Sequence, residues 1–290
     1  MNIRHPVRAG TFYESSPSSC RRHATKLIDN AELSKDLPKQ LFGGIVPHAG
    51  WTYSGRLAAM TLKAIAAAQP PRTVVLLGAD HTGAVRRAEV YDSGVWHTPL
   101  GEVAVDEEVA AALLEAGDLM QANPNAHDYE HSIEVQIPIL QVLCPEARIV
   151  PIAVPPTHEA VQIGEMIGQV LSQRFPAVHV VASTDLTHHG GHFPAPGGRG
   201  EKGVKWTVAN DRRMIDLMES MAAEQVVPEC ESRGNACGAG AVAAGIAACR
   251  AIGATRGILL EYTNSYEVVH KMYPYELDDT TVGYASGVFA

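Results

Sequence analysis

Residues 73–81 read TVVLLGADH, and this stretch decides the fold class. Residues 73–78 form a short, almost wholly apolar run, which predicts a strand covered on both faces. Such a strand belongs inside a sheet that carries helices on both sides. The polar residues that follow it, Asp80 and His81, are then expected where the strand ends.

Segments of the same kind alternate with helix-period segments along the rest of the chain. Residues 56–68 show the helical spacing, with apolar side chains at Leu57, Met60 and Ala64. This alternation predicts an α/β fold with a layered mixed sheet flanked by helices, and we expect one domain over residues 1–290. The expected strands are residues 43–47, 73–78, 148–154, 178–183, 257–262 and 282–289. The expected helices are residues 56–68, 106–116, 132–143, 158–173, 208–223 and 236–251.

Three local features refine this prediction. Asp106 is expected to cap the helix over residues 106–116. Pro138 should bend the helix over residues 132–143 or end its first half. Residues 193–203 (FPAPGGRGEKG) are expected to form a lid or a disordered surface loop.

Composition excludes several classes of protein. The 290 residues carry 23 Lys and Arg against 32 Asp and Glu, a formal net charge of −9, which argues against a nucleic-acid binder with a basic face. No apolar run is long enough for a membrane span, and the N-terminal residues lack the apolar core of a signal peptide. The 5 cysteines show no paired spacing, which is typical of reduced thiols. We therefore expect a cytoplasmic protein that binds neither membrane nor nucleic acid.

Three of the 13 histidines fall within a few residues after predicted strands. They are His48, His81 and His188, and in open α/β sheets ligands bind outside the carboxyl ends of the strands. Imidazole binds transition metals and transfers protons, so convergence of these three predicts a metal or acid–base site. Asp185, three residues before His188, can orient an imidazole or can simply cap a turn.

Cys237 lies in a Gly- and Ala-rich segment where a helix is expected to begin. A helix N-terminus lowers the pKa of a thiol, and thiolate is both a nucleophile and a soft metal ligand. The alternative is a small buried residue in a tightly packed helix, which is also the expectation for Cys144 and Cys249.

Residues 127–134 (HDYEHSIE) are dense in ionisable groups. If a helix begins near Ser132, His131 and Glu134 share one face and can line a pocket. The alternative is a solvated, acidic first turn. The chain contains no phosphate-loop, nucleophile-elbow, paired-cysteine zinc or HExxH motif.

Six short segments spread over nearly the whole chain carry a family resemblance. They are residues 8–13 (RAGTFY), 47–55 (PHAGWTYSG), 77–81 (LGADH), 130–134 (EHSIE), 183–188 (STDLTH) and 235–238 (NACG). In this order they resemble the Memo family, also known as the B component of the AmmeMemoRadiSam set. That resemblance implies a functional association with AMMECR-like and radical SAM proteins.

The resemblance also implies a fold similar to the class III extradiol (LigB-like) dioxygenases, which are non-haem iron enzymes. His48 and His81 match the family's two metal-binding histidines, and Cys237 matches its third ligand. The dioxygenases use a carboxylate in that third position, whereas thiolate is softer and also favours Cu(I) or Zn. Iron as Fe²⁺ is the expected metal, with copper or zinc as alternatives.

The other matching positions belong to the pocket around the metal. His188 matches the histidine that acts as acid or base in the related dioxygenases, and Asp185 matches a pocket aspartate. His131 and Glu134 match the HSIE block of the family, and Tyr53 is expected to line the pocket and donate a hydrogen bond.

Three functions remain open at this point. The first is a metal-binding redox protein, dioxygenase-like, that acts on a small, for example aromatic, substrate. The second is a hydrolase that uses bound zinc or Cys237 as nucleophile with His188 and Asp185. The third is a non-catalytic module that binds a peptide or small anion, with Arg199 and Lys202 assisting.

Overall fold

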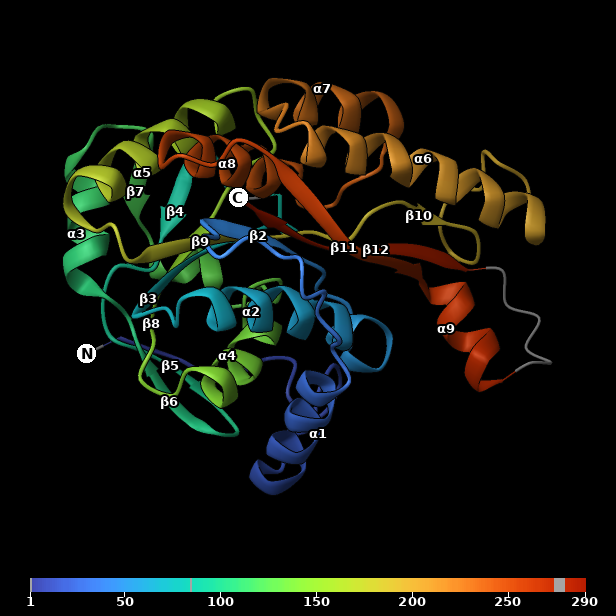
Figure 1. Ribbon diagram of the computed structural model, residues 1–290, viewed down its shortest axis with the longest axis horizontal. Helices are drawn as coiled ribbons and strands as arrows, with labels where there is room; N and C mark the ends of the chain where they lie inside the picture. Colours follow the sequence, from blue (N-terminus) through green and yellow to red (C-terminus); the bar gives the residue numbers. More distant parts are fainter. Residues whose placement is uncertain (1, 84, 274–279) are drawn as a thin grey trace.

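A mixed nine-stranded sheet forms the centre of the computed structural model, which describes residues 2–83, 85–273 and 280–290 (Figure 1). The strand order is β10-β12-β2-β9-β3-β8-β4-β7, and β11 pairs with the other edge of β12. The strands are β2 (Gly43–Val46), β3 (Thr73–Gly78), β4 (Ala88–Val90), β7 (Met120–Ala122), β8 (Arg148–Ala153), β9 (Val178–Ser183), β10 (His188–His189), β11 (Gly257–Asn264) and β12 (Thr281–Phe289).

Four central strands, β2, β9, β3 and β8, run parallel to one another. Their carboxyl ends therefore meet at one edge of the sheet. His48 follows β2, His81 follows β3 and Asp185 follows β9, so chain segments far apart in sequence arrive at the same place.

Strand β3 shows why an apolar run belongs in the middle of this sheet. Val75 and Leu77 pack into the core on one face, whereas Val74 and Leu76 pack into the core on the other. All four are at most 2% exposed, and burying each such side chain contributes roughly 1.5–3 kcal/mol. The prediction of a strand covered on both faces is confirmed.

Helices cover the two faces of the sheet in separate layers (Figure 1). Gly164 and Gly168 allow α5 to approach α8 closely, because a Cβ at either position would lie within 2.5 Å of an α8 carbonyl oxygen. One layer contains α3 (Glu107–Glu115), α5 (Ala160–Arg174), α6 (Glu201–Glu219), α7 (Ala223–Arg233) and α8 (Ala239–Ala251). The other contains α1 (Pro17–Asp29), α2 (Arg56–Ala68) and α4 (Ile137–Leu143), while α9 (Ser265–Met272) lies against β11 and β12.

The N-terminal segment of the chain, residues 2–14, contributes one strand to a second, smaller sheet that the sequence patterns did not predict. Its strands are β1 (Ile3–Arg4), β5 (Val95–Thr98) and β6 (Gly101–Ala104). From there the segment runs to Phe12, which reaches the carboxyl-end edge of the main sheet.

Most predicted elements are present, and Asp106 caps α3 by accepting a hydrogen bond from the Val109 amide. The helix predicted over residues 132–143 is wrong in its first half, which forms a 3₁₀ turn before α4 begins at Ile137. Pro138 therefore lies in the first turn of α4, where its missing N–H costs no hydrogen bond.

A second helix differs from the prediction at both of its ends. Helix α6 spans Glu201–Glu219, so it begins before residue 208 and includes the end of the predicted loop. That loop is also packed at two points, because a Cβ on Gly197 would lie 2.4 Å from Trp206 and one on Gly203 would lie 2.5 Å from His189. Within residues 2–83, 85–273 and 280–290, no helix combines the length and apolarity needed to cross a membrane.

Candidate metal centre

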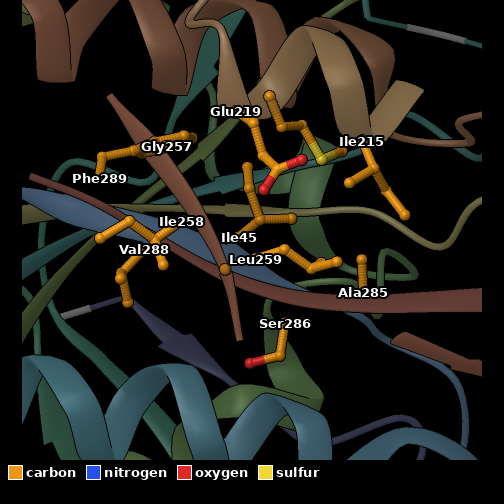
Figure 2. A pocket seen from close by; sticks show the side chains of 12 residues that line it. Ile45, Ile215, Glu219, Gly257, Ile258, Leu259, Ala285, Ser286, Val288 and Phe289 are labelled. Atoms are coloured by element: carbon orange, nitrogen blue, oxygen red, sulfur yellow. The ribbon is translucent and has the colours of Figure 1, made fainter. Parts of the chain in front are cut away.

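Two cavities in the described residues differ in chemistry. The crevice between β11, β12 and α6 is lined almost entirely by apolar side chains, and its free volume of about 10 Å³ leaves room for about one water (Figure 2). A second cavity of about 500 Å³ lies at the carboxyl-end edge of the sheet. Histidines, a carboxylate and aromatic rings line this second cavity, so it is the candidate functional site. They are Phe12, His48, Tyr53, His81, His131, Asp185, His188, Phe193 and Tyr284.

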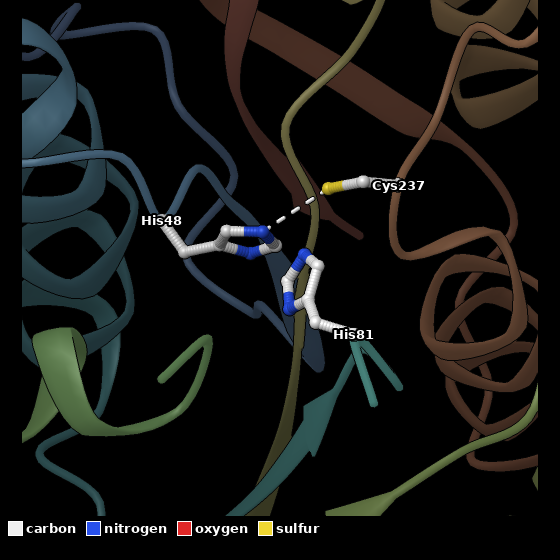
Figure 3. A group of neighbouring side chains, drawn as sticks. All are labelled: His48, His81 and Cys237. Atoms are coloured by element: carbon white, nitrogen blue, oxygen red, sulfur yellow. Dashed lines mark hydrogen bonds between the residues drawn. The ribbon is translucent and has the colours of Figure 1, made fainter. Parts of the chain in front are cut away.

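Three potential metal ligands converge beside this cavity. His48, His81 and Cys237 each offer one donor atom, and these atoms lie within 4.8 Å of one another (Figure 3). His48 Nε2 lies 3.1 Å from Cys237 Sγ. Two tetrahedral ligands at about 2.1 Å (N) and 2.3 Å (S) from a metal would be roughly 3.6 Å apart, so the donors are close to metal-binding spacing.

Hydrogen bonds fix the orientation of the His48 ring. The Ser183 hydroxyl donates to the Ser132 carbonyl (2.8 Å), so it is free to accept from His48 Nδ1 (2.9 Å). Nδ1 then carries the proton, and Nε2 presents its lone pair toward Cys237. Asp185 Oδ1 accepts from the His48 backbone amide at 2.7 Å, which holds the loop after β2 against the loop after β9.

Glu130 fixes the orientation of the His81 ring in a similar way. Its carboxylate accepts from His81 Nδ1 at 3.0 Å and from the backbone amides of His81, His131 and Ser132 at 2.8–2.9 Å. A carboxylate behind the ring fixes the tautomer and leaves Nε2 free for a metal. His81, Glu130 and His131 also group closely enough to hold an ion, but these hydrogen bonds already occupy the Glu130 oxygens.

Cys237 lies in the turn between α7 and α8. Its amide donates to the Asp185 carbonyl (3.1 Å), and the Asp185 amide donates to Sγ (3.2 Å). Gly238 is required beside it, because a Cβ there would lie 2.2 Å from the Ser183 carbonyl oxygen. Burial and the nearby Asp185 carboxylate raise the pKa of the Cys237 thiol, so the lowering expected from the helix N-terminus is wrong.

Burial shifts the pKa values of the ionisable side chains in the site. It lowers the pKa of His48 well below its usual value, and the neighbouring His81 adds to this; His131 is lowered to about 4 for the same two reasons. Burial also opposes protonation of His81, but the Glu130 carboxylate outweighs it and raises that pKa. Burial raises the pKa of Asp185 to about 7.

The predicted pocket residues divide into two groups. Tyr53, His131, Asp185 and His188 line the cavity. Glu134 does not face it, because the segment around residue 134 is a 3₁₀ turn that directs this side chain into the interior, where it is 1% exposed. The expectation that His131 and Glu134 share one helical face is therefore wrong.

The arrangement of Asp185, His188 and Cys237 differs from the one that the cysteine-nucleophile hydrolase alternative predicts. The Asp185 carboxylate bonds to the His48 backbone instead of orienting His188, and Cys237 Sγ faces His48 Nε2. The His188 ring instead packs against Phe193, with 4.9 Å between ring centroids.

Sequence reasoning missed Glu130, Ser183, Phe12 and Tyr284 as site residues. Glu130, Ser183 and Phe12 belong to the segments that carried the resemblance, so the motifs marked them without giving their roles. Tyr284 lies within a predicted strand, and only the pairing of β12 with β10 shows that this part of the strand lies beside the cavity.

Comparison of the sequence with known proteins finds one family and relatives that belong to it. The family described as "Memo-like protein" matches residues 4–288. A MEMO1 family protein of Methanopyrus kandleri is 36% identical over 99% of this chain and 98% of its own length. A MEMO1 family protein of Thermococcus onnurineus is 35% identical over 99% of each chain. The crystal structure of an uncharacterized protein from Escherichia coli K12 covers 84% of this chain and 99% of its own, with a TM-score of 0.48 and 14% identity.

Proposed function

Because the chain belongs to the Memo-like protein family, we propose that it is a metal-binding redox protein whose ion is held by His48, His81 and Cys237. The observation that carries the proposal is the pair of oriented imidazoles facing a thiol. Ser183 and Glu130 each bind an Nδ1, so that both Nε2 atoms remain available. This donor set suits iron, copper or zinc, and we propose iron as Fe²⁺.

Two of the three proposed ligands, His48 and His81, line the cavity, so a metal held by the three side chains would have coordination positions open toward it. Iron, when bound, would supply redox chemistry at those positions, as in the non-haem iron oxygenases. The cavity of about 500 Å³ and its aromatic lining favour a small, partly apolar substrate, of which an aromatic ring is the simplest example.

His188 and Asp185 are the proposed acid–base residues. Burial lowers the pKa of His188, so near neutral pH its ring is uncharged and able to accept a proton. Asp185, with a pKa of about 7, can hold or release a proton in the same range. Tyr53, 42% exposed, places its ring at the rim of the cavity, where a substrate would pass. The association with AMMECR-like and radical SAM proteins belongs to the same proposal.

The first experiment is elemental analysis of tag-free protein purified without oxygen. We expect near-stoichiometric iron in the wild type and in His188→Ala, and its loss in His48→Ala and Cys237→Ala. His97→Ala is the matched control, because the His97 side chain also bonds to a glutamate and is about as exposed as that of His81 (31% and 33%), but it lies outside the group of His48, His81 and Cys237.

Each result points to a different function. Zinc lost in the same two variants would replace the redox proposal with zinc-dependent hydrolysis. Loss of metal from His188→Ala would make His188 a ligand. Absence of metal after reconstitution with Fe(II), Cu(I) and Zn(II) would contradict the proposal and leave a binding module or a cysteine nucleophile.

A further inference from the structure

Two neighbouring residues on α6, Asn210 and Asp211, bind both chain segments that carry His188 and Cys237. They are 5% and 0% exposed, and neither residue lines the cavity. Buried polar side chains are costly unless they are hydrogen-bonded, so their partners are informative.

Asn210 bridges the two segments with a single amide group. Its Nδ2 donates to the Thr187 hydroxyl at 2.9 Å and to the Arg233 carbonyl at 3.1 Å, which uses both of its N–H bonds. Asn235 Nδ2 donates back to the Asn210 carbonyl at 3.0 Å. The turn that leads to Cys237 is thus bound to α6 on both sides of Gly234.

Asp211 holds the His188 segment from the same helix. Its Oδ1 accepts from the Thr187 amide at 2.8 Å, and its Oδ2 accepts from the Tyr262 hydroxyl at 2.7 Å. Gly283 of β12 lies directly against this carboxylate, since a Cβ there would be 1.8 Å from Oδ2. Gly283 in turn donates to the Thr187 carbonyl at 3.1 Å, so the residue before His188 is bonded on both sides.

We propose that Asn210 and Asp211 are positioning residues that set the placement of Cys237 relative to His188. This inference rests on the proposed function, in which Cys237 holds the metal and His188 exchanges protons. Thr187 and Arg233 belong to different segments, and only the Asn210 side chain hydrogen-bonds to both among the described contacts. A shift of α6 would therefore move the acid–base residue and the thiol together.

The same helix face provides a matched control. Thr207, one turn before Asn210, is also fully buried, and its hydroxyl has no hydrogen-bond partner among the described residues. Thr187→Val and Thr207→Val make the same chemical change at two buried sites, but only the first removes an acceptor from Asn210. A purely structural role predicts that Thr187→Val destabilises the fold more than Thr207→Val, since only Thr187 loses a hydrogen bond, but leaves the environment of Cys237 unchanged.

The test uses Co²⁺ alone as a probe, because a cobalt–thiolate bond gives a charge-transfer absorption that reports the Cys237 environment. We expect Thr187→Val to weaken Co²⁺ binding about 10-fold and to alter this band. Thr207→Val should change the affinity by less than about twofold. Equal spectra and affinities in the two variants would overturn the proposal.

Variants of Asn210 and Asp211 on α6 also test the positioning role, because they change the α6 partners of these hydrogen bonds. Asn210→Asp keeps the shape but removes both donors, so we expect it to weaken Co²⁺ binding at least as much as Thr187→Val does. Asp211→Asn retains an oxygen for the Thr187 amide and should preserve the band that Asp211→Ala loses. An unaltered band in Asp211→Ala would contradict the assignment.

Metal-free protein separates this inference from the proposed function. If the wild type gives no cobalt band, the metal proposal fails, and the rate of Cys237 alkylation by iodoacetamide, mapped by mass spectrometry, becomes the readout. We expect faster alkylation in Thr187→Val than in Thr207→Val or the wild type. Identical rates in all three proteins would overturn the positioning role.

Discussion

Glu130 and Glu134 lie four residues apart, and both are almost completely buried, yet they serve different parts of the molecule. Glu130 accepts hydrogen bonds from the His81 ring and from the loop around it. Glu134 forms a buried ion pair with Arg4 and accepts from the Tyr13 hydroxyl. One glutamate thus supports a candidate metal ligand, and the other fastens the N-terminal segment.

The difference teaches that the partner decides what a buried carboxylate does. An imidazole that binds Glu130 through Nδ1 still has Nε2 to offer to a metal, whereas the guanidinium of Arg4 has only donors. The two regions also touch, because Arg4 donates to the Glu130 carbonyl at 2.7 Å. Variants of Glu130 and Glu134 can therefore test whether the two glutamates have separate roles.

The largest expected effect is on stability. Glu134→Gln removes the charge that balances buried Arg4 and should reduce the free energy of unfolding by about 3–5 kcal/mol. Urea unfolding of metal-free protein measures it, with exposed Glu115→Gln as a control expected to change it by less than about 0.5 kcal/mol. A loss at Glu134 no greater than that at Glu115 would mean that the buried pair contributes little.

The second prediction concerns metal affinity. Glu130→Gln should weaken metal binding about 10- to 100-fold, because the amide supports the His81 ring less strongly as a base. Competition with a chelator measures this affinity. Glu102→Gln is the matched control, since Glu102 bonds to His97 at the same 3.0 Å on the surface. If Glu134→Gln weakened binding more than Glu130→Gln in folded protein, the division of roles would be wrong.

The smallest expected effect is a pH dependence of the Glu130–His81 pair. Burial opposes ionisation of Glu130, but hydrogen bonds from His81 and backbone amides outweigh it and hold its pKa well below 4.5. Its contribution is present above pH 4.5 and is lost as the pH falls. The pKa of His81 is raised above 6.5, so its contribution is present below pH 6.5 and is lost as the pH rises through the raised value.

The difference in unfolding free energy between metal-free wild type and Glu130→Gln should consequently be greatest between pH 4.5 and 6.5. Below that window it should decline by about 1 kcal/mol per pH unit. Urea unfolding at a series of pH values measures the profile. A difference that stays constant from pH 3 to 9 would show that the pair is not coupled to folding.

Sequence patterns predicted the middle of the main sheet well but did not predict the second, smaller sheet. Residues 73–78 form β3 and residues 56–68 form α2 as expected, because an apolar run or a clear helical period leaves little choice of structure. The strands β1, β5 and β6 were not predicted. Each of them is two to four residues long, and their pairing depends on contacts between distant segments.

The candidate site shows the same division. The convergence of His48 and His81 followed from their positions after parallel strands, and the family membership is confirmed by the comparisons. The placement of Glu134 could not be predicted, because a local change from helix to 3₁₀ turn reverses the direction of a side chain. Its partner, Arg4, lies 130 residues away in sequence.

The sequence by itself determined the alternation of strands and helices, the family, and the residue types able to bind a metal. Those properties depend on local periodicity and on motifs that are only a few residues long. Only the tertiary structure decided that Cys237 faces His48, that Glu130 supports His81, and that Asn210 joins two segments. Hydrogen bonds and close contacts require atoms within about 3 Å, and sequence spacing does not determine distances between segments that fold against each other.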